Sequence, residues 1–299
     1  MPKDQIVTFF KDAIFSRINE HEADWVTSRI KSLTEDAKPK DLFLAFSAVP
    51  RFVEKRKLNW NPKELKEADT LRSGFNPEPW TLDQLVRTYL LLKFDVNEKL
   101  YHSSVEQIFD TADMRELATL YKSLPVLPYQ KRFLERAEEG VRTNMTTVFD
   151  AIALENPYPF DHFSENAWNQ MVLKAAFMDR PIYRIYGIDE RSNAELSRII
   201  SDYAHERWAA GRSVSPELWR PVGRFINDAL IEDAERLFQS DSVKEKQAAA
   251  LLCLNSEDEV LQAKLNERND LKQQVENKDI TWDNLGASIW EQQEESESL

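Results

Sequence analysis

The sequence predicts an all-α protein, built as a HEAT-like helical repeat or α-solenoid, with a compact multi-helix bundle as the alternative. Glycine is scarce, with only six in 299 residues. Helix-capping patterns recur along the chain, and apolar residues follow the three- and four-residue spacing of helices buried on one face. We find no alternating apolar and polar run bounded by hairpin turns, as a β-sheet would require.

Capping signals mark the predicted helix starts. A Ser or Thr followed three residues later by Glu or Gln can satisfy two backbone N–H groups at a helix N-terminus. Such pairs occur at Thr81 with Gln84, Ser192 with Glu195, Ser242 with Glu245, and Ser256 with Glu259. Ser215 before Pro216 is a further start, because proline suits the first helical position. Prolines also mark the predicted connections, at Pro39, Pro62, Pro77, Pro79, Pro125, Pro128, Pro157, Pro159, Pro181, Pro216 and Pro221.

No clear linker interrupts these helices, so we predict one continuous helical domain over residues 1–290. Residues 229–268 read as a HEAT-like helix pair, with a short polar turn before a small-residue helix. A single such pair gives no fixed period, and the bundle therefore remains an alternative to the repeat. Residues 291–299 are acidic, and we expect a frayed tail there.

Composition narrows the classes of function. The formal net charge is -13, of which -8 lies in residues 255–299, so nonspecific nucleic-acid binding is disfavoured because phosphates would be repelled. No apolar run approaches the roughly 20 residues that span a bilayer. The only cysteine, Cys253, lies on an apolar helical stripe, where a buried, inert thiol is expected. We therefore expect a cytoplasmic protein in a reducing compartment.

Signatures of catalysis are absent from the sequence, which favours a non-catalytic protein without a cofactor. There is no GxxxxGK[ST] phosphate loop, no GxSxG elbow and no CxxC or HExxH zinc motif. A weak metal hypothesis rests on two His and carboxylate pairs three residues apart, which would share a helix face. These candidates are His162 with Glu165 and Asp202 with His205.

The candidate binding residues lie in residues 156–224, which carry nine basic groups, eight of them arginine, among interleaved aromatic residues. Arginine offers a rigid five-donor fork that stacks on rings and clamps carboxylates or phosphates. The candidates are Trp168, Asn169, Arg180, Arg184, Arg191, Arg207, Trp208, Arg212, Trp219 and Arg220. They would be presented by helices over residues 164–178, 193–208 and 216–225. The structural alternative is that they form ion pairs and cation–π contacts between helices, with Asn169 setting helix register.

Residues 155–225 also resemble the EboA proteins of the bacterial ebo gene cluster. The resemblance is carried by ENPYPFDHFSENAWNQMVLKAAFMDRP, DYAHERWAAGR and PELWRPVGRF. It implies a setting beside a prenyltransferase, a sugar-phosphate cyclase and metal-dependent hydrolases, in clusters associated with making or exporting secondary metabolites. It implies no catalytic residues.

Together these observations favour an accessory protein of a secondary-metabolite pathway. Its arginine- and tryptophan-rich surface would bind another protein of the pathway, at the membrane surface, or an anionic or prenylated metabolite. The rival hypothesis is an enzyme or lipid-handling protein that holds a prenyl-type or phosphate-bearing metabolite in a helical cavity. A deep apolar pocket beside the arginines would favour the rival, and a flat exposed face would favour the accessory protein.

Overall fold

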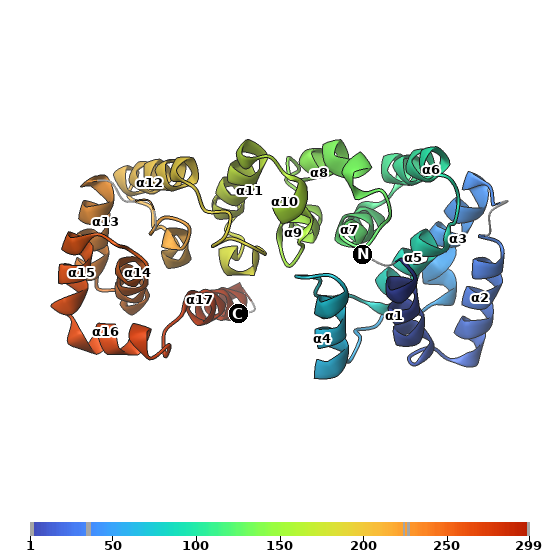
Figure 1. Cartoon of the computed structure of the whole chain (residues 1–299), viewed down its shortest axis with the longest axis horizontal. Coiled ribbons are helices and arrows are strands. Elements are labelled where there is room, and N and C mark those ends of the chain that lie inside the picture. The colour runs from blue at the N-terminus through green and yellow to red at the C-terminus, as the bar shows by residue number, and fades with distance from the viewer. Residues whose placement is uncertain (1–2, 34–36, 224, 226–227, 298–299) are drawn as a thin grey trace. The chain divides into compact units, whose positions relative to one another are not determined.

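A computed structural model of the chain describes residues 3–33, 37–223, 225 and 228–297. Within these ranges the regular structure is helical, apart from one isolated bridge between Lys57 and Thr81. The all-α prediction is therefore confirmed. The helices are coloured along the chain in Figure 1.

The chain divides into two compact units, Met1–Phe163 and Ser164–Leu299, which are described separately. Our prediction of one continuous domain stays a prediction. The first unit contains α1 (Lys3–Phe15), α2 (Glu20–Lys31), α3 (Pro39–Phe52), α4 (Pro62–Leu71), α5 (Leu82–Lys93), α6 (Glu98–Thr111), α7 (Met114–Ser123), η1 (Gln130–Phe133), α8 (Leu134–Gly140), α9 (Thr146–Ala153) and α10 (Tyr158–His162).

The second unit contains α11 (Glu165–Phe177), η2 (Ile182–Arg184), α12 (Ala194–Ala209), η3 (Pro216–Trp219), α13 (Asp228–Gln239), α14 (Val243–Leu254), α15 (Glu259–Asn266), α16 (Asn269–Glu276) and α17 (Trp282–Glu297). Here η marks a 3-10 helix. α17 continues through residues 291–297, where the sequence predicts a frayed tail, and residues 298–299 lie outside the described part.

The first unit is organised around α5. Ten of its twelve residues are buried, because α1, α2, α3 and α7 all pack against it. A helix buried on nearly all faces is mostly apolar, as the run Leu90 to Leu92 is, and its buried polar side chains need partners. Arg87 donates to the Phe46 carbonyl at 3.2 Å, and the Thr88 hydroxyl lies 2.6 Å from that of Ser123. The start of α5 is as predicted: the Gln84 side chain accepts a hydrogen bond from the Thr81 backbone N–H at 3.1 Å.

The second unit has α14 at its centre. α13, α15, α16, α17 and η3 all contact it, and residues Ala248 to Cys253 are buried. Small side chains let the neighbouring helices approach closely. Cys253 is 0% exposed, and burial raises the pKa of its thiol to about 12, as expected for an inert thiol. The predicted helix pair within 229–268 is present as α13 and α14, while its HEAT-like character stays a prediction.

Two predicted helix starts are wrong by one or two residues. Ser242 does cap α14, since its Oγ accepts the Glu245 N–H at 3.4 Å. However, Asn193 rather than Ser192 caps α12, and Asp258 rather than Ser256 caps α15. In both places a side-chain carbonyl oxygen closer to the helix takes the capping bond, and an Asn or Asp at this position competes well with Ser.

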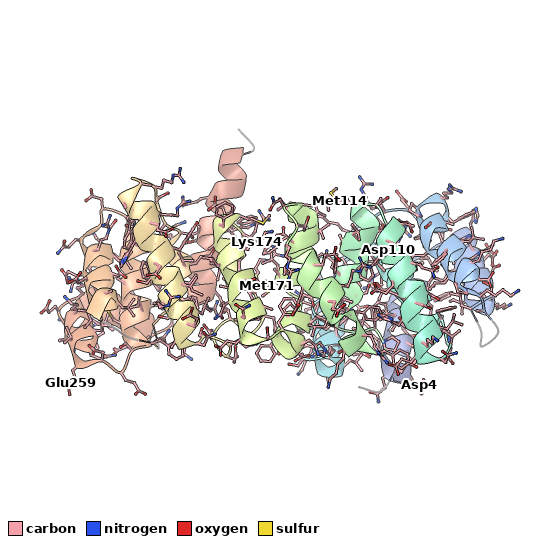
Figure 2. The ribbon with its side chains drawn as sticks, turned by 90° about the horizontal axis from the view of Figure 1, so that it is seen from above. Asp4, Asp110, Met114, Met171, Lys174 and Glu259 are labelled. Carbon is pink, nitrogen blue, oxygen red and sulfur yellow. The ribbon has the colours of Figure 1, made fainter. Side chains whose placement is uncertain are left out.

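The predicted helix over residues 216–225 is also wrong. Only the four-residue η3 forms, with Ser215 at its N-cap and Pro216 at its first position. Pro221 follows closely, and a proline lacks the N–H that a continuing helix needs. The two predicted helices over 164–178 and 193–208 are confirmed as α11 and α12. In Figure 2 Met171 and Lys174 lie one turn apart on α11, the first buried and the second half-buried.

A buried carboxylate ties α2 to the segment after α3. Glu22 is 4% exposed, and its oxygens accept hydrogen bonds from the backbone N–H groups of Asn19 and Glu54 at 3.0 and 3.1 Å. The Arg56 guanidinium donates to both oxygens, at 2.9 and 2.8 Å. The hydrogen bonds from Arg56 are the largest cause that lowers the pKa of Glu22, from 4.5 to about 2.

This pair predicts a pH-dependent stability of the first unit. The pKa of Glu22 is lower in the folded chain, so its contribution is present above pH 4.5 and is lost as the pH falls towards 2. Between pH 5 and 2 the free energy of unfolding should fall by about 3 kcal/mol more in the native chain than in the Glu22→Gln variant. Urea unfolding at a series of pH values measures both, and parallel curves would contradict the prediction.

Candidate ligand hollow and the arginine-rich block

The predicted residues Trp168 and Asn169 are both buried on α11, 0% and 2% exposed. The Arg191 guanidinium lies 4.7 Å from the centroid of the Trp168 ring. The Asn169 and Asn193 amides donate to each other, at 3.1 and 2.8 Å, and Asn193 also accepts the Leu196 N–H that begins α12. This geometry joins α11 to the start of α12, which supports the register interpretation of Asn169.

Trp208 and Trp219 form a second cluster. Their rings stack with centroids 5.6 Å apart, and the Arg236 guanidinium lies 4.1 Å from the Trp208 centroid. Trp219 is fully buried and Trp208 is half-buried. Arg236 comes from α13, so the cluster packs α12 and η3 on a helix that the sequence did not associate with them.

Arg220 is held between two carboxylates. It donates to both oxygens of Asp189, at 2.9 and 2.7 Å, and to Asp283 at 2.6 Å. Its side chain is 10% exposed, and although burial lowers the pKa of the guanidinium, these two carboxylates raise it overall. The neighbouring Glu217 is 5% exposed, accepts the Tyr183 N–H at 3.0 Å, and has its pKa raised by burial.

The remaining arginines are spread over the second unit. Arg180 lies 4.6 Å from the Trp290 ring centroid, Arg207 donates to the Ser213 carbonyl at 2.8 Å, and Arg184 is half-buried in η2. Arg180 and Arg207 line one small cavity of about 20 Å³. This volume suits about one water molecule and not a metabolite.

Arg212 is exposed just after the end of α12. Gly211 has a φ of +67°, and the Arg212 N–H bonds to the Arg207 carbonyl at 2.9 Å, which closes a Schellman cap.

The four metal candidates do not form the predicted pairs of metal ligands. His162 ends α10 and Glu165 begins α11, so the two do not share a helix face. Asp202 pairs with Arg198 at 2.6 Å, and His205 bonds to the buried Asp233 at 2.6 Å. In the described ranges no group of three or more His, Cys, Asp or Glu side chains is arranged to hold a metal ion.

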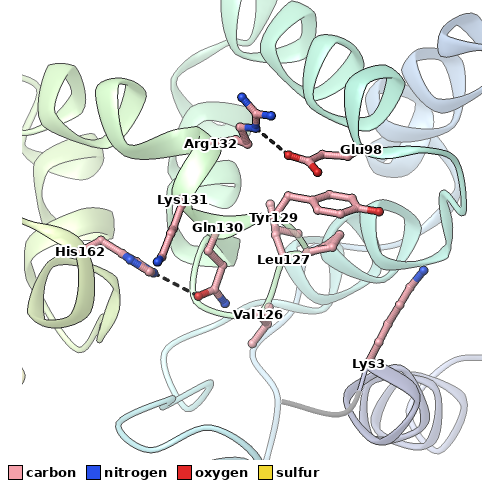
Figure 3. Close-up of a pocket in the computed structure, with 10 residues that line it drawn as sticks. Lys3, Glu98, Val126, Leu127, Tyr129, Gln130, Lys131, Arg132 and His162 are labelled. Atoms are coloured by element: carbon pink, nitrogen blue, oxygen red, sulfur yellow. Dashed lines mark hydrogen bonds and ion pairs between the residues drawn. The ribbon is translucent and has the colours of Figure 1, made fainter.

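The first unit contains a hollow of about 730 Å³ that the sequence did not reveal. We name it the Tyr129 hollow. It is lined by Lys3, Glu98, Val126, Leu127, Pro128, Tyr129, Gln130, Lys131, Arg132 and His162. Figure 3 shows His162 and Lys131 on one side of it and Lys3 on the other.

The Tyr129 hollow combines apolar and basic groups. Val126 and Leu127 are each 2% exposed and form its apolar part with Pro128 and the Tyr129 ring. Three basic side chains and only one carboxylate supply its charges. Arg132 pairs with that carboxylate, on Glu98, at 2.6 Å. In the described part of the chain Lys131 makes no ion pair, so its charge is available to a ligand.

Gln130 and His162 form the polar wall of the hollow. The Gln130 amide nitrogen donates to the Pro125 carbonyl at 2.5 Å, which leaves its oxygen to accept from His162 Nε2 at 3.2 Å. Burial lowers the pKa of His162, and nearby Arg72 and Lys131 lower it further. The lowered pKa favours the neutral imidazole, and the Gln130 oxygen matches the tautomer that carries its proton on Nε2.

Tyr129 stands in an unusual backbone conformation at the edge of the hollow. Its φ is +57°, in the left-handed region that bulky residues rarely occupy, and its ring is 41% exposed. The ring lies edge-on to the buried Tyr101, with centroids 5.7 Å apart. Strain of this kind persists where the surroundings impose it, and such sites cluster at ligand-binding positions.

The sequence contained one usable signal for this hollow. The run Pro125 to Arg132 places two prolines, an aromatic residue and two adjacent basic residues between helices. We interpreted these prolines only as a connection. Lys3, Glu98 and His162 come from distant parts of the chain, and no local pattern joins them.

The sequence matches one family model. The family model described as "Metabolite traffic protein EboA" matches residues 6–223. No curated protein and no solved structure matches the chain. Across the described residues, no helix is both long and apolar enough to cross a membrane. Because the matched residues make up well over half of the sequence, the chain belongs to the EboA family.

Proposed function

We propose that this protein binds a small anionic metabolite with an apolar portion, such as a prenyl-type chain, in the Tyr129 hollow and does not convert it chemically. It would act as an accessory protein in the biosynthesis or export of a secondary metabolite. The family description, metabolite traffic, supports a role in handling metabolites. We further propose a cytoplasmic location and contact with other proteins of the pathway at the membrane surface.

The observation that carries this proposal is the combination of apolar groups with an uncompensated cation in one hollow. Its volume of about 730 Å³ falls in the range of about 300–1,000 Å³ typical of small-molecule sites. Lys3 pairs with Asp95 at 2.5 Å and Arg132 with Glu98 at 2.6 Å, so Lys131 supplies the charge that would attract an anion.

Binding without catalysis is favoured by the partners of the polar groups. His162 bonds to an amide oxygen and not to a hydroxyl, thiol or carboxylate that it would activate or be oriented by. The adjacent Asp161 carboxylate is engaged by Arg72. The contacts of His162 and Asp161 therefore hold the polar wall of the hollow in place and do not activate a nucleophile.

The anion selectivity can be tested with 8-anilinonaphthalene-1-sulfonate, an aromatic sulfonate whose fluorescence reports binding. The Lys131→Glu variant should weaken its affinity about tenfold, because reversing a charge beside the sulfonate removes an attraction and adds a repulsion. N-phenyl-1-naphthylamine, which lacks the sulfonate, should bind the variant within about twofold of the native affinity, since its binding is apolar.

Lys66→Glu is the matched control, because Lys66 is an exposed lysine of the same unit that does not line the hollow. It should leave both affinities unchanged. Equal losses for the two probes, or equal effects of the two variants, would show that the hollow does not select an anion.

We also propose that most of the arginine-rich block is the framework of the second unit. Asn169→Ala would remove a buried amide and leave the half-buried amide of Asn193 without its partner, so the free energy of unfolding should fall by about 1–3 kcal/mol. Arg212→Ala should change it by less than about 0.5 kcal/mol, because Arg212 is exposed. Urea unfolding measures both, and a larger loss for Arg212→Ala would contradict this assignment.

A further inference from the structure

α17 covers a basic face of the second unit. We name the α17 face by the four residues that hold the helix, Arg180, Tyr183, Arg220 and Lys244. These residues come from the segments around η2 and η3 and from α14, and α17 packs against all three elements. The face therefore has one occupant, from the end of the same chain.

Three positions of α17 meet the face, and they share one side of the helix. Asp283 accepts from Arg220 Nη1 at 2.6 Å, and the Trp290 ring lies under the Arg180 guanidinium at 4.6 Å. Between them, a Cβ added to Gly286 would lie 2.6 Å from three atoms of Tyr183. Spacings of three and four residues place these positions along one side, with the glycine backbone seated on the tyrosine.

Charge also matches across this contact. Residues 282–297 contain five acidic residues and no basic one. Lys244 adds a third cation to the face and donates to the Ser288 carbonyl at 2.7 Å and to the Gln292 side chain at 2.8 Å. The face thus fits an acidic helix with an Asp, Gly and Trp at this spacing.

The docking of α17 is incomplete at its N-terminal end. A polar hollow of about 240 Å³, lined by residues that include Ser192, Asn255 and Thr281, lies between its first turn and the face. Asp283 remains 74% exposed, so its ion pair with Arg220 is worth little. Arg220 keeps its two bonds to Asp189 without Asp283, so the face is pre-organised when α17 leaves.

The family match covers three of the four residues of the face and none of its occupant. Arg180, Tyr183 and Arg220 lie within the matched residues 6–223, whereas Lys244 and α17 lie beyond them. We propose that α17 occupies, within the chain, a docking face for an acidic helix of a protein partner, and that the partner binds by displacing α17. This inference goes beyond metabolite binding and does not depend on the Tyr129 hollow.

The test measures capture of a fluorescein-labelled peptide of residues 281–297 by the full chain, using fluorescence anisotropy. The native chain should bind the peptide weakly, because its own α17 competes at high effective concentration. Gly286→Leu should displace α17 and bind the peptide at least tenfold more tightly. Hydrogen exchange of residues 282–292 should rise in this variant, which reports the release of α17.

A second full-chain variant, Asp283→Lys with Trp290→Ala, releases α17 through its own polar contacts and leaves the face unaltered. It should also bind the peptide at least tenfold more tightly, so unfolding of Gly286→Leu would not leave the proposal untested. A peptide carrying the same two changes should not bind, and Arg220→Ala added to either variant should reduce capture about threefold, because an exposed ion pair contributes little.

A further peptide keeps the acidic residues, Gly286 and Trp290 at their spacing and has alanine elsewhere. It should bind the released variants within about threefold of the natural sequence. Release of α17 without capture of either peptide, or capture of the natural sequence alone, would mean that the contact is internal packing and would overturn the proposal. A released variant that forms a dimer by exchanging α17 would equally overturn it in favour of self-association.

Discussion

Burial of α5 on nearly all of its faces is the constraint on which the first unit depends. α7 packs against it, and the end of α7 is positioned by a buried hydroxyl pair, Thr88 Oγ1 and Ser123 Oγ, 2.6 Å apart. The run Pro125 to Arg132 begins immediately after this point. The Tyr129 hollow is therefore formed by a segment whose origin is set by core packing.

The run Pro125 to Arg132 is also held at its C-terminal end by side chains of α10 and α6. Tyr158 donates its hydroxyl proton to the Gln130 carbonyl at 2.7 Å, and His102 bonds to the Arg132 carbonyl at 3.1 Å. Two backbone carbonyls of the short helix η1 are thereby satisfied by side chains of α10 and α6. With both ends held, the backbone between them keeps Tyr129 in its left-handed conformation, and a ligand would meet a wall that needs little ordering.

What the sequence predicted well was local. The capping pair at Thr81, the pair at Ser242 and the buried Cys253 depend on residues within one or two turns, so the pattern alone identifies them. Even a local prediction can miss by one residue. Ser192 and Asn193 are adjacent and both are good capping residues, and Asn193 is the one that caps α12. The Tyr129 hollow could not be predicted for a different reason. Lys3, Glu98 and His162 are far apart in the sequence and come together only after the chain has folded.

Arginine marks the other limit of sequence reasoning. Its guanidinium serves a ligand and a buried ion pair with the same five donors, so abundance alone does not separate the two uses. Arg220 is a structural tie through Asp189 and a docking contact through Asp283. Asp189 belongs to the body of the second unit and Asp283 to the helix that covers it. The same guanidinium therefore stabilises the second unit through Asp189 and contacts α17 through Asp283. Neither carboxylate lies near Arg220 in the sequence, so the sequence alone does not reveal either contact.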